Sequence, residues 1–248
     1  MHFKNAKLAL ITGASSGLGL ALAKALDERG IPLLLSARGP SNELPHAEWI
    51  LCDLAKTREP LLQAIQQRAP DLLINNAGFT IYGDCLDEYA SQEEIFAVNA
   101  KAPFELALEA ARVLKEQKRG GVILNIGSAA SLFSFPGMAT YSASKAFLAS
   151  FSRSLDAELK DFGIRSLVAL PGQISTPFAS KAARNPMLSR PSFSMPVEKA
   201  VHLLLRQIER RIPYAVPDWR VRLAALVPRS ILERTMRKNI IERLDRLG

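Results

Sequence analysis

The sequence lacks the features of a membrane or secreted protein. None of its apolar runs reaches the roughly 18 residues that a membrane-spanning helix needs. Residues 1–7 have no apolar core of the kind found in a signal peptide, and residues 8–11 fit a first buried strand instead. There are only two cysteines, Cys52 and Cys85, which fits a reducing compartment. We therefore expect a cytoplasmic protein.

Histidine and nucleic-acid-binding motifs are also scarce. The three histidines, His2, His46 and His202, show no metal-ligand spacing and no evident catalytic triad, so no metal site is expected. The formal net charge is +8, but no recognition motif accompanies the basic residues, so nucleic acid is not an expected partner. The hydrophobic fraction of 48% in 248 residues is that of one folded domain with a full core.

What the sequence does contain is a regular succession of apolar runs and helical stretches. The runs are apolar without alternation, which is typical of parallel strands covered on both faces. The pattern predicts an α/β fold, a Rossmann-type doubly wound parallel sheet between two helical layers, in a single catalytic domain over residues 1–217. Strands are expected at residues 8–12, 32–36, 49–51, 72–75, 122–127 and 164–170, and helices near 18–29, 58–68, 92–117, 141–162 and 197–210.

A glycine-rich turn joins the first expected strand to the first expected helix. Glycine lets the backbone turn tightly and approach a pyrophosphate, whose charge is favoured at the N-terminus of a helix. The spacing differs from G-x-G-x-x-G, and a turn without a ligand is the alternative. The candidate cofactor-binding residues of this turn are Gly13, Ser15, Ser16, Gly17, Leu18 and Gly19.

The second expected strand ends without the acidic residue that would bind the adenosine ribose of NAD. Arg38 follows instead, and its guanidinium can bind a 2′-phosphate through two parallel hydrogen bonds. This favours NADP(H) over NAD(H), the alternative being a solvated loop arginine. After the third strand, Asp53, with Leu54 beside it, can bind the adenine amino group, or the aspartate can cap a helix.

Two further strand ends carry candidate cofactor contacts, because the carboxyl ends of parallel strands line the ligand crevice. The segment after the sixth strand can hold the nicotinamide carboxamide through backbone and hydroxyl groups. In both places an ordinary turn is the alternative. The residues concerned are Asn76, Ala77 and Gly78 after the fourth strand, and Pro171, Gly172, Ile174 and Thr176 after the sixth.

Tyr141 and Lys145 lie four residues apart, which puts the phenol and the ammonium on one face of a helix. A phenol titrates near ~10, and a neighbouring ammonium lowers that pKa, so the pair predicts a proton-transfer device. Ser128, at the end of the fifth strand, can donate a hydrogen bond to a substrate carbonyl. Beside a nucleotide site, this set indicates reduction of a carbonyl or oxidation of an alcohol. Asn99 either belongs to this set of site residues or is a core amide whose hydrogen bonds are all made within the protein.

These residues, in this order, resemble the short-chain dehydrogenase/reductase family from Lys7 to about Ile174. Each motif is weak alone, but their joint order and spacing are specific. The motifs are T-G-A-S-S-G-L-G at residues 12–19, N-N-A-G at 75–78, Asn99, Ser128, Y-S-A-S-K at 141–145 and P-G at 171–172.

The resemblance implies NAD(P) bound on a seven-stranded parallel sheet and hydride transfer between nicotinamide C4 and a carbonyl or alcohol carbon. It makes Tyr141 the general acid in reduction and the general base in oxidation. Lys145 would hold the nicotinamide ribose and lower the pKa of the tyrosine, Ser128 would polarise the carbonyl, and Asn99 would position a water. It also implies a homodimer or homotetramer that pairs the helices carrying Asn99 and Tyr141.

Two departures from the family pattern bear on the cofactor. Between Arg38 and Glu48 the chain is too short for a helix between strands two and three, and Pro40 and Pro45 also argue against one. We therefore expect a compact loop and an open adenine edge. Ser16 is neutral at a turn where NADP-using members often carry a basic residue, which counts against NADP.

The region beyond Ile174 carries the least specific signals. Residues 175–195 contain several prolines and are expected to form a loop over the substrate, an apolar or medium-sized carbonyl compound. An apolar pocket is expected from Phe79, Phe133, Phe135, Met138, Phe178 and Met187.

Residues 218–248 form a basic C-terminal extension. Its apolar residues Leu232, Met236, Ile240, Leu244 and Leu247 recur at helical spacing. Packing on the same subunit or on a partner is one interpretation. The other is peripheral contact with an anionic membrane surface.

Together these patterns predict an oxidoreductase that transfers a hydride between NADP(H) and a small carbonyl or alcohol substrate. Two alternatives remain open: a non-catalytic NADP(H)-binding sensor or scaffold, and a lipid carbonyl reductase at a membrane surface.

Overall fold

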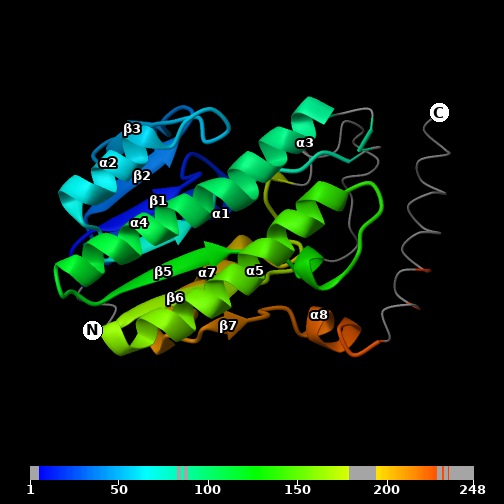
Figure 1. Ribbon diagram of the computed structural model, residues 1–248. Coiled ribbons are helices and arrows are strands. Elements are labelled where there is room, and N and C mark those ends of the chain that lie inside the picture. Colours follow the sequence, from blue (N-terminus) through cyan, green and yellow to red (C-terminus); the bar gives the residue numbers. More distant parts are fainter. Residues whose placement is uncertain are drawn as a thin grey trace.

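The computed structural model describes residues 6–82, 85–86, 89–178, 194–227, 231 and 234. A seven-stranded parallel sheet forms its centre (Figure 1), in the order β3-β2-β1-β4-β5-β6-β7. The order reverses direction between β1 and β4, as in a doubly wound sheet. The strands are β1 (Ala9–Thr12), β2 (Leu33–Ala37), β3 (Glu48–Leu51), β4 (Leu72–Asn75), β5 (Gly121–Ile126), β6 (Ile164–Ala169) and β7 (Tyr214–Ala215).

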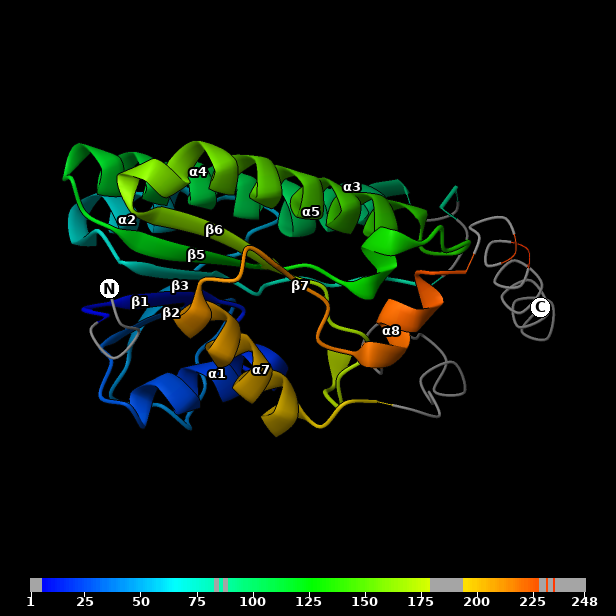
Figure 2. The same cartoon turned by 90° about the horizontal axis from the view of Figure 1, so that it is seen from below.

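Helices cover both faces of the sheet (Figure 2), so the expected three-layer α/β architecture is confirmed. Successive residues of a strand point to opposite faces, and β1 shows why its run is apolar throughout. Ala9 and Ile11 enter the core under α1 and α7, whereas Leu10 enters the core under α2 and α4. The helices are α1 (Gly17–Asp27), α2 (Glu59–Arg68), α3 (Tyr89–Phe96), α4 (Ala102–Glu116), α5 (Ala139–Leu159), α7 (Val197–Arg210) and α8 (Trp219–Ala224).

The expected single helix over residues 92–117 has an interruption. It begins earlier, as α3, and a π-helical turn over Ala97–Lys101 separates α3 from α4. A π-helical turn is a local widening that often occurs at functional sites, and this one contains Asn99. The expected loop without a helix between β2 and β3 is confirmed, because no helix lies between Ala37 and Glu48.

The last strand was not placed from the sequence. β7 has only two residues, both half-buried, and pairs with Val168 and Ala169 of β6. After it, Asp218 begins α8, whose residues contact the turn that follows β6. Most of the expected substrate loop and the apolar repeat from Leu232 to Leu247 lie outside the described residues. Within the described residues, no helix combines the length and apolarity needed to cross a membrane.

Candidate active site

The expected site residues gather where the parallel strands end. Thr12, Asn75, Ile126 and Ala169 are the last residues of β1, β4, β5 and β6, which are neighbours in the sheet. The carboxyl ends of these strands therefore form one edge, on which the glycine turn, N-N-A-G, Ser128 and the segment after β6 follow directly.

The glycine turn needs its glycines for two separate reasons. Gly13 and Gly17 have φ of +66° and +57°, the left-handed region that favours glycine. Gly19 lies in α1, where a Cβ atom would come within 2.3 Å of the Gly13 carbonyl oxygen and 2.4 Å of Asn76 Nδ2. No side chain larger than hydrogen fits there without displacing the backbone.

Asn76 and Thr12 join the glycine turn to the segment after β4. Asn76 Nδ2 donates to the carbonyl oxygens of Thr12 at 3.0 Å and Gly13 at 3.2 Å. In return, Thr12 Oγ1 accepts hydrogen bonds from the backbone N–H groups of Asn76 and Ala77, at 3.1 and 3.0 Å. Segments about sixty residues apart in the chain thus form one cradle.

The N-terminus of α1 opens into this cradle. Ser16, its N-cap residue, makes no capping hydrogen bond with its side chain, and the first turn has no acidic residue. The first N–H groups of a helix have no partner within it and carry partial positive charge, so this end suits an anionic phosphate. A Cβ atom on Gly17 would lie 3.4 Å from Thr176 Cβ, which brings Thr176 to the same turn. Ser15 and Leu18 are half-buried beside it.

Arg38 and Asp53 follow β2 and β3, which are neighbouring strands. Arg38 is exposed and makes no hydrogen bond or ion pair with any described residue, so its guanidinium is available to a ligand. Asp53 Oδ1 accepts a hydrogen bond from the Ala55 backbone at 3.1 Å. The alternative role of Asp53 as a cap of the following helix is wrong, because α2 begins at Glu59 and Asp53 closes an earlier turn. Leu54 is buried.

Ser128, Tyr141 and Lys145 lie together at the ends of β5 and α5. Ser128 Oγ accepts from the Ala130 backbone at 3.1 Å, and its hydroxyl is hydrogen-bonded to the phenol of Tyr141. Lys145 Nζ lies 5.9 Å from the centre of the Tyr141 ring and donates to the Ile126 carbonyl oxygen at 2.9 Å. Both Tyr141 and Lys145 are buried. The expected placement on one helical face is therefore observed.

Burial dominates the ionisation of this pair. It raises the pKa of Tyr141 to about 12, which the hydrogen bond with Ser128 opposes and the nearby Tyr82 phenol reinforces. Burial also lowers the pKa of Lys145 to about 8. The pKa of Tyr141 is therefore raised on balance, and Lys145 is not among the causes of this shift. The lysine ammonium is directed to the Ile126 carbonyl oxygen. That Lys145 lowers the pKa of the phenol stays a prediction.

Asn99 reaches this group from the π-helical turn. Its Oδ1 accepts from the Phe79 backbone N–H at 3.0 Å, and its Nδ2 donates to the Phe79 carbonyl oxygen at 2.8 Å. A Cβ atom on Gly78 would lie 3.0 Å from Asn99 Oδ1 and 3.4 Å from Lys145 Nζ. Both polar atoms of the Asn99 amide are thus hydrogen-bonded, as expected of a core amide. The amide also lies close to Lys145, with Gly78 between them.

The segment after β6 completes the edge. Pro171 accepts a hydrogen bond from the Ala129 backbone at 2.8 Å. Ile174 forms an isolated parallel bridge with Met195. Gly172 is covered by residues from the C-terminal extension, since a Cβ atom there would meet Asp218 Oδ2 at 3.0 Å and Val221 Cγ2 at 3.2 Å.

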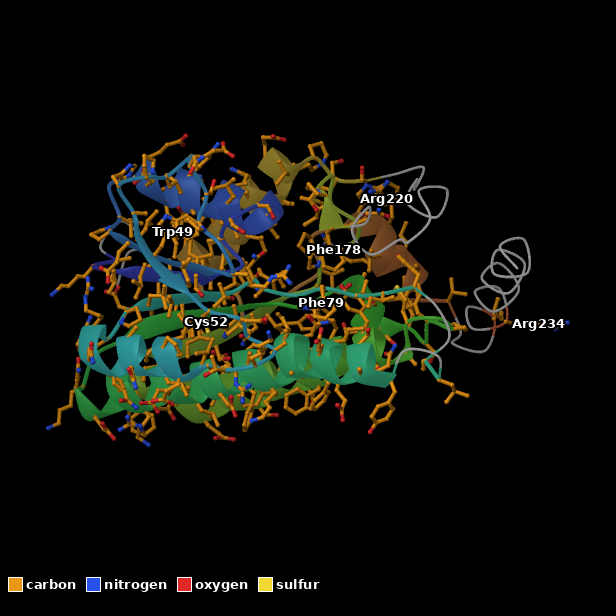
Figure 3. The ribbon with its side chains drawn as sticks, turned by 90° about the horizontal axis from the view of Figure 1, so that it is seen from above. Trp49, Cys52, Phe79, Phe178, Arg220 and Arg234 are labelled. Carbon is orange, nitrogen blue, oxygen red and sulfur yellow. The ribbon has the colours of Figure 1, made fainter. Side chains whose placement is uncertain are left out.

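An apolar cluster surrounds Tyr141. The ring of Phe178 lies 6.1 Å from that of Tyr141, centre to centre (Figure 3 shows Phe178 and Phe79). Four of the six residues expected to form an apolar pocket contact Tyr141 or its cluster. Phe133 lies one step away, with its ring 6.3 Å from that of Phe135, and Met187 is outside the described residues. The cluster consists of Ile95, Ala130, Met138 and Tyr141, with Phe79, Ile81, Tyr82 and Phe135 packed against them.

Two residues near the site were missed from the sequence. Tyr82 influences Tyr141 directly, and its position four residues after N-N-A-G was the available signal. Asp218 contacts Gly172 from far along the chain, and no motif marks it. In the described part of the chain, no group of three His, Cys, Asp or Glu side chains can hold a metal ion.

A phosphate-binding cradle on a doubly wound sheet, next to a buried phenol and amine, defines an NAD(P)-dependent oxidoreductase. The family model described as short chain dehydrogenase matches residues 7–186. The chain belongs to this family, and it is an NAD(P)-dependent dehydrogenase or reductase.

Relatives and solved structures agree with this assignment. An uncharacterised oxidoreductase of Thermotoga maritima is 37% identical over 187 residues, 69% of this chain and 73% of that protein. A 3-ketodihydrosphingosine reductase of Bacteroides thetaiotaomicron is 33% identical over 178 residues, 69% of this chain and 65% of that protein.

The fold matches two solved structures that contain different dinucleotides. A short chain dehydrogenase from Burkholderia cenocepacia in complex with NADP has a TM-score of 0.81 and 26% identity, covering 95% of this chain and 99% of that one. A 4-hydroxyisoleucine dehydrogenase mutant complexed with NADH and succinate has a TM-score of 0.76 and 25% identity, covering 85% and 96%. Likeness in fold alone therefore leaves both dinucleotides open, and the residues at the adenine edge must decide between them.

Proposed function

We propose that the protein reduces a ketone or aldehyde with NADPH and that Tyr141 gives the proton to the carbonyl oxygen. The observation that carries this proposal is that half-buried Ser128 and buried Lys145 both lie next to buried Tyr141, beside the glycine cradle. A general acid and a hydrogen-bond donor within reach of one reacting atom are what carbonyl reduction requires.

The residues of the strand edge suit NADP(H), which supplies the hydride that adds to the carbonyl carbon. The free N–H groups at the start of α1 would hold the pyrophosphate and Arg38 the 2′-phosphate. Asp53 and the N-N-A-G segment would contact the adenosine part. Lys145 would bind the nicotinamide ribose, and residues from Pro171 to Thr176 the carboxamide. The NADP-bound relative supports this choice, and the NADH-bound one keeps NAD as the alternative.

The protonation state of Tyr141 suits the proton-donor role. With its pKa raised to about 12, the phenol is protonated at neutral pH and ready to donate as negative charge develops on the carbonyl oxygen. Ser128 donates to the same oxygen, and the product is the alcohol. Lys145, with a pKa of about 8, is charged at neutral pH and stabilises the phenolate left behind. We assign Asn99 a positioning role, because its amide fixes the Phe79 backbone beside Lys145.

A panel of ketones and aldehydes tests the reaction directly. We expect NADPH to be consumed, with loss of absorbance at the nicotinamide band and one alcohol formed for each NADPH oxidised. NADPH that binds tightly while no carbonyl compound is reduced would instead support the non-catalytic sensor.

Arg38 should decide the choice of dinucleotide. Replacing Arg38 with Ala should raise KM for NADPH by about 10- to 100-fold and leave KM for NADH within about twofold, since a charged hydrogen bond contributes about 1.5–3 kcal/mol. Arg206→Ala is the matched control, because Arg206 is also exposed but lies on α7, away from the strand edge. Equal effects of Arg38→Ala on both dinucleotides would contradict a 2′-phosphate contact.

We also propose a homodimer or homotetramer formed through α4 and α5. These helices expose Leu108 and Phe147, and Phe147 stacks on Phe151 with an interplanar angle of 3°. Exposed large apolar side chains on two adjacent helices suit a protein contact.

A further inference from the structure

The residues of α8 and the turn after it present a row of exposed apolar side chains. Trp219 and Leu223 are four residues apart and share one face of α8, and Leu226 lies in the turn that follows it. Their exposed fractions are 62%, 55% and 80%. Val227 and Ile231 extend the row. Single exposed apolar residues are ordinary, but a continuous row on one short segment marks an interaction surface. We call this row the α8 face.

Positive charge accompanies the α8 face. Arg222 and Arg234 are exposed, and the side chain of neither forms a hydrogen bond or ion pair with a described residue. From Trp219 to the C-terminus the sequence contains eight basic and three acidic residues, a net charge of +5. Apolar side chains with Trp among them, next to unpaired arginines, are the combination that binds an anionic lipid surface.

The α8 face lies at the mouth of the candidate active site. Asp218 and Val221, at the start of α8, touch the Gly172 turn from the side opposite the α8 face residues. The first residues of α3 lie at the same end of the molecule as α8 (Figures 1 and 2). Tyr89, the first residue of α3, is 72% exposed, and Leu86, three residues earlier in the chain, is 87% exposed. Exposed apolar residues thus lie at the end of the molecule at which the strands finish.

Phe178 links the solvent-exposed surface with the apolar cluster around Tyr141. Phe178 is 39% exposed, yet its ring contacts the ring of buried Tyr141 (Figure 3). Behind it lie Phe79, Ile81 and Met138 of the apolar cluster. A substrate that entered beside Phe178 would leave water for apolar surroundings before its carbonyl met Tyr141. Such a path favours substrates with hydrocarbon chains.

We propose that the α8 face docks the protein on an anionic membrane surface and turns the active-site mouth toward it, so that the carbonyl substrate is a long-chain ketone dissolved in that membrane. The docking stands on the α8 face alone, whereas the substrate class rests on the proposed carbonyl reduction. The 3-ketodihydrosphingosine reductase among the relatives supports a lipid ketone.

Tryptophan fluorescence provides the direct test of docking. The chain has two tryptophans, and Trp49 is half-buried with its Nε1 bonded to the Leu44 carbonyl oxygen, so Trp49→Phe leaves Trp219 as the only reporter. We expect Trp219 emission to shift to the blue with vesicles of mixed phosphatidylglycerol and phosphatidylcholine. The shift should weaken as salt rises. An unchanged spectrum, or an equal shift on pure phosphatidylcholine, would overturn the proposal.

A matched pair of variants locates the contact. The double variant L223D/L226D should lower sedimentation with anionic vesicles by at least about tenfold. Each leucine that becomes buried in the membrane should raise the affinity for the vesicle by more than about tenfold. Phe162→Asp is the control with unchanged binding, since Phe162 is 49% exposed but lies at the opposite end of the sheet. If L223D/L226D instead reduced the molecular mass in solution, the α8 face would be a contact between protein chains and the proposal would fail.

Two substrates separate this inference from the proposed function. L223D/L226D should reduce a short water-soluble ketone at the normal rate but lose at least about tenfold in rate on a long-chain ketone in anionic vesicles. Equal rates of wild type and variant on the long-chain ketone would refute delivery from the membrane. A wild type that binds vesicles but reduces neither ketone would refute the carbonyl reduction and leave the docking intact.

Discussion

Tyr141→Phe should lower the rate of carbonyl reduction by about 10³-fold while the affinity for NADPH changes by less than about threefold. The substitution removes only the phenolic oxygen, which is the proton donor in the proposed reaction. The ring would remain packed against Phe178 and the apolar cluster, so the fold and the cradle should be unaffected. Single-turnover rates of NADPH oxidation and a binding titration measure the two quantities separately.

Tyr214→Phe is the appropriate comparison for that variant. Tyr214 is a partly buried tyrosine on β7 whose ring lies beside Arg153, and it takes no part in the proposed chemistry. The Tyr214→Phe variant should keep the wild-type rate of carbonyl reduction. A Tyr141→Phe enzyme that retained more than about a tenth of the wild-type rate would show that another group delivers the proton.

Lys145→Met should abolish most activity and yet stabilise the folded protein. Burial lowers the pKa of Lys145 from 10.5 to about 8, so the folded state disfavours the ammonium by about 3 kcal/mol at neutral pH. Loss of the hydrogen bond to the Ile126 carbonyl oxygen offsets part of the gain. We expect the free energy of unfolding at pH 7 to rise by about 1–2 kcal/mol. The reduction rate should fall by about 10²-fold, since the phenolate loses its neighbouring charge.

The stability difference should also depend on pH. Between about pH 8 and 10.5 the folded wild type releases the Lys145 proton, whereas the unfolded chain keeps it. Wild-type stability therefore gains with rising pH relative to Lys145→Met, and the advantage of the variant should shrink by about 2 kcal/mol from pH 7 to 9.5. Urea unfolding of both proteins at the two pH values measures this change. Lys115→Met, at an exposed lysine on α4, should show neither effect. A constant difference would mean that the pKa of Lys145 is not lowered in the folded state.

The sequence was sufficient for six strands of the sheet and for the grouping of the expected site residues at its edge, because both depend on local patterns. β4 was predicted to the residue, since a run of apolar residues ends at the asparagine pair. Tyr141 and Lys145 share a face because helical geometry fixes that spacing. β7 was not predicted, because two half-buried residues are too few to show a strand pattern in the sequence.

The pKa values of the site residues could not be predicted from the sequence in the same way. The pKa of Tyr141 depends on how deeply other segments bury it, and these include Phe178, Phe79 and Met138. The contact of Asp218 with Gly172 likewise depends on where the chain returns after β7. A motif indicates which groups are near one another along the chain, but not how much water the tertiary fold leaves around them.

The exchange of hydrogen bonds between Thr12 and Asn76 has a thermodynamic consequence. The backbone loop that we propose to bind the dinucleotide is held by four hydrogen bonds with the segment that follows a neighbouring strand, so its shape is set by the protein itself. Association then requires little loss of conformational entropy from the receptor, so less of the contact energy is spent on ordering the loop.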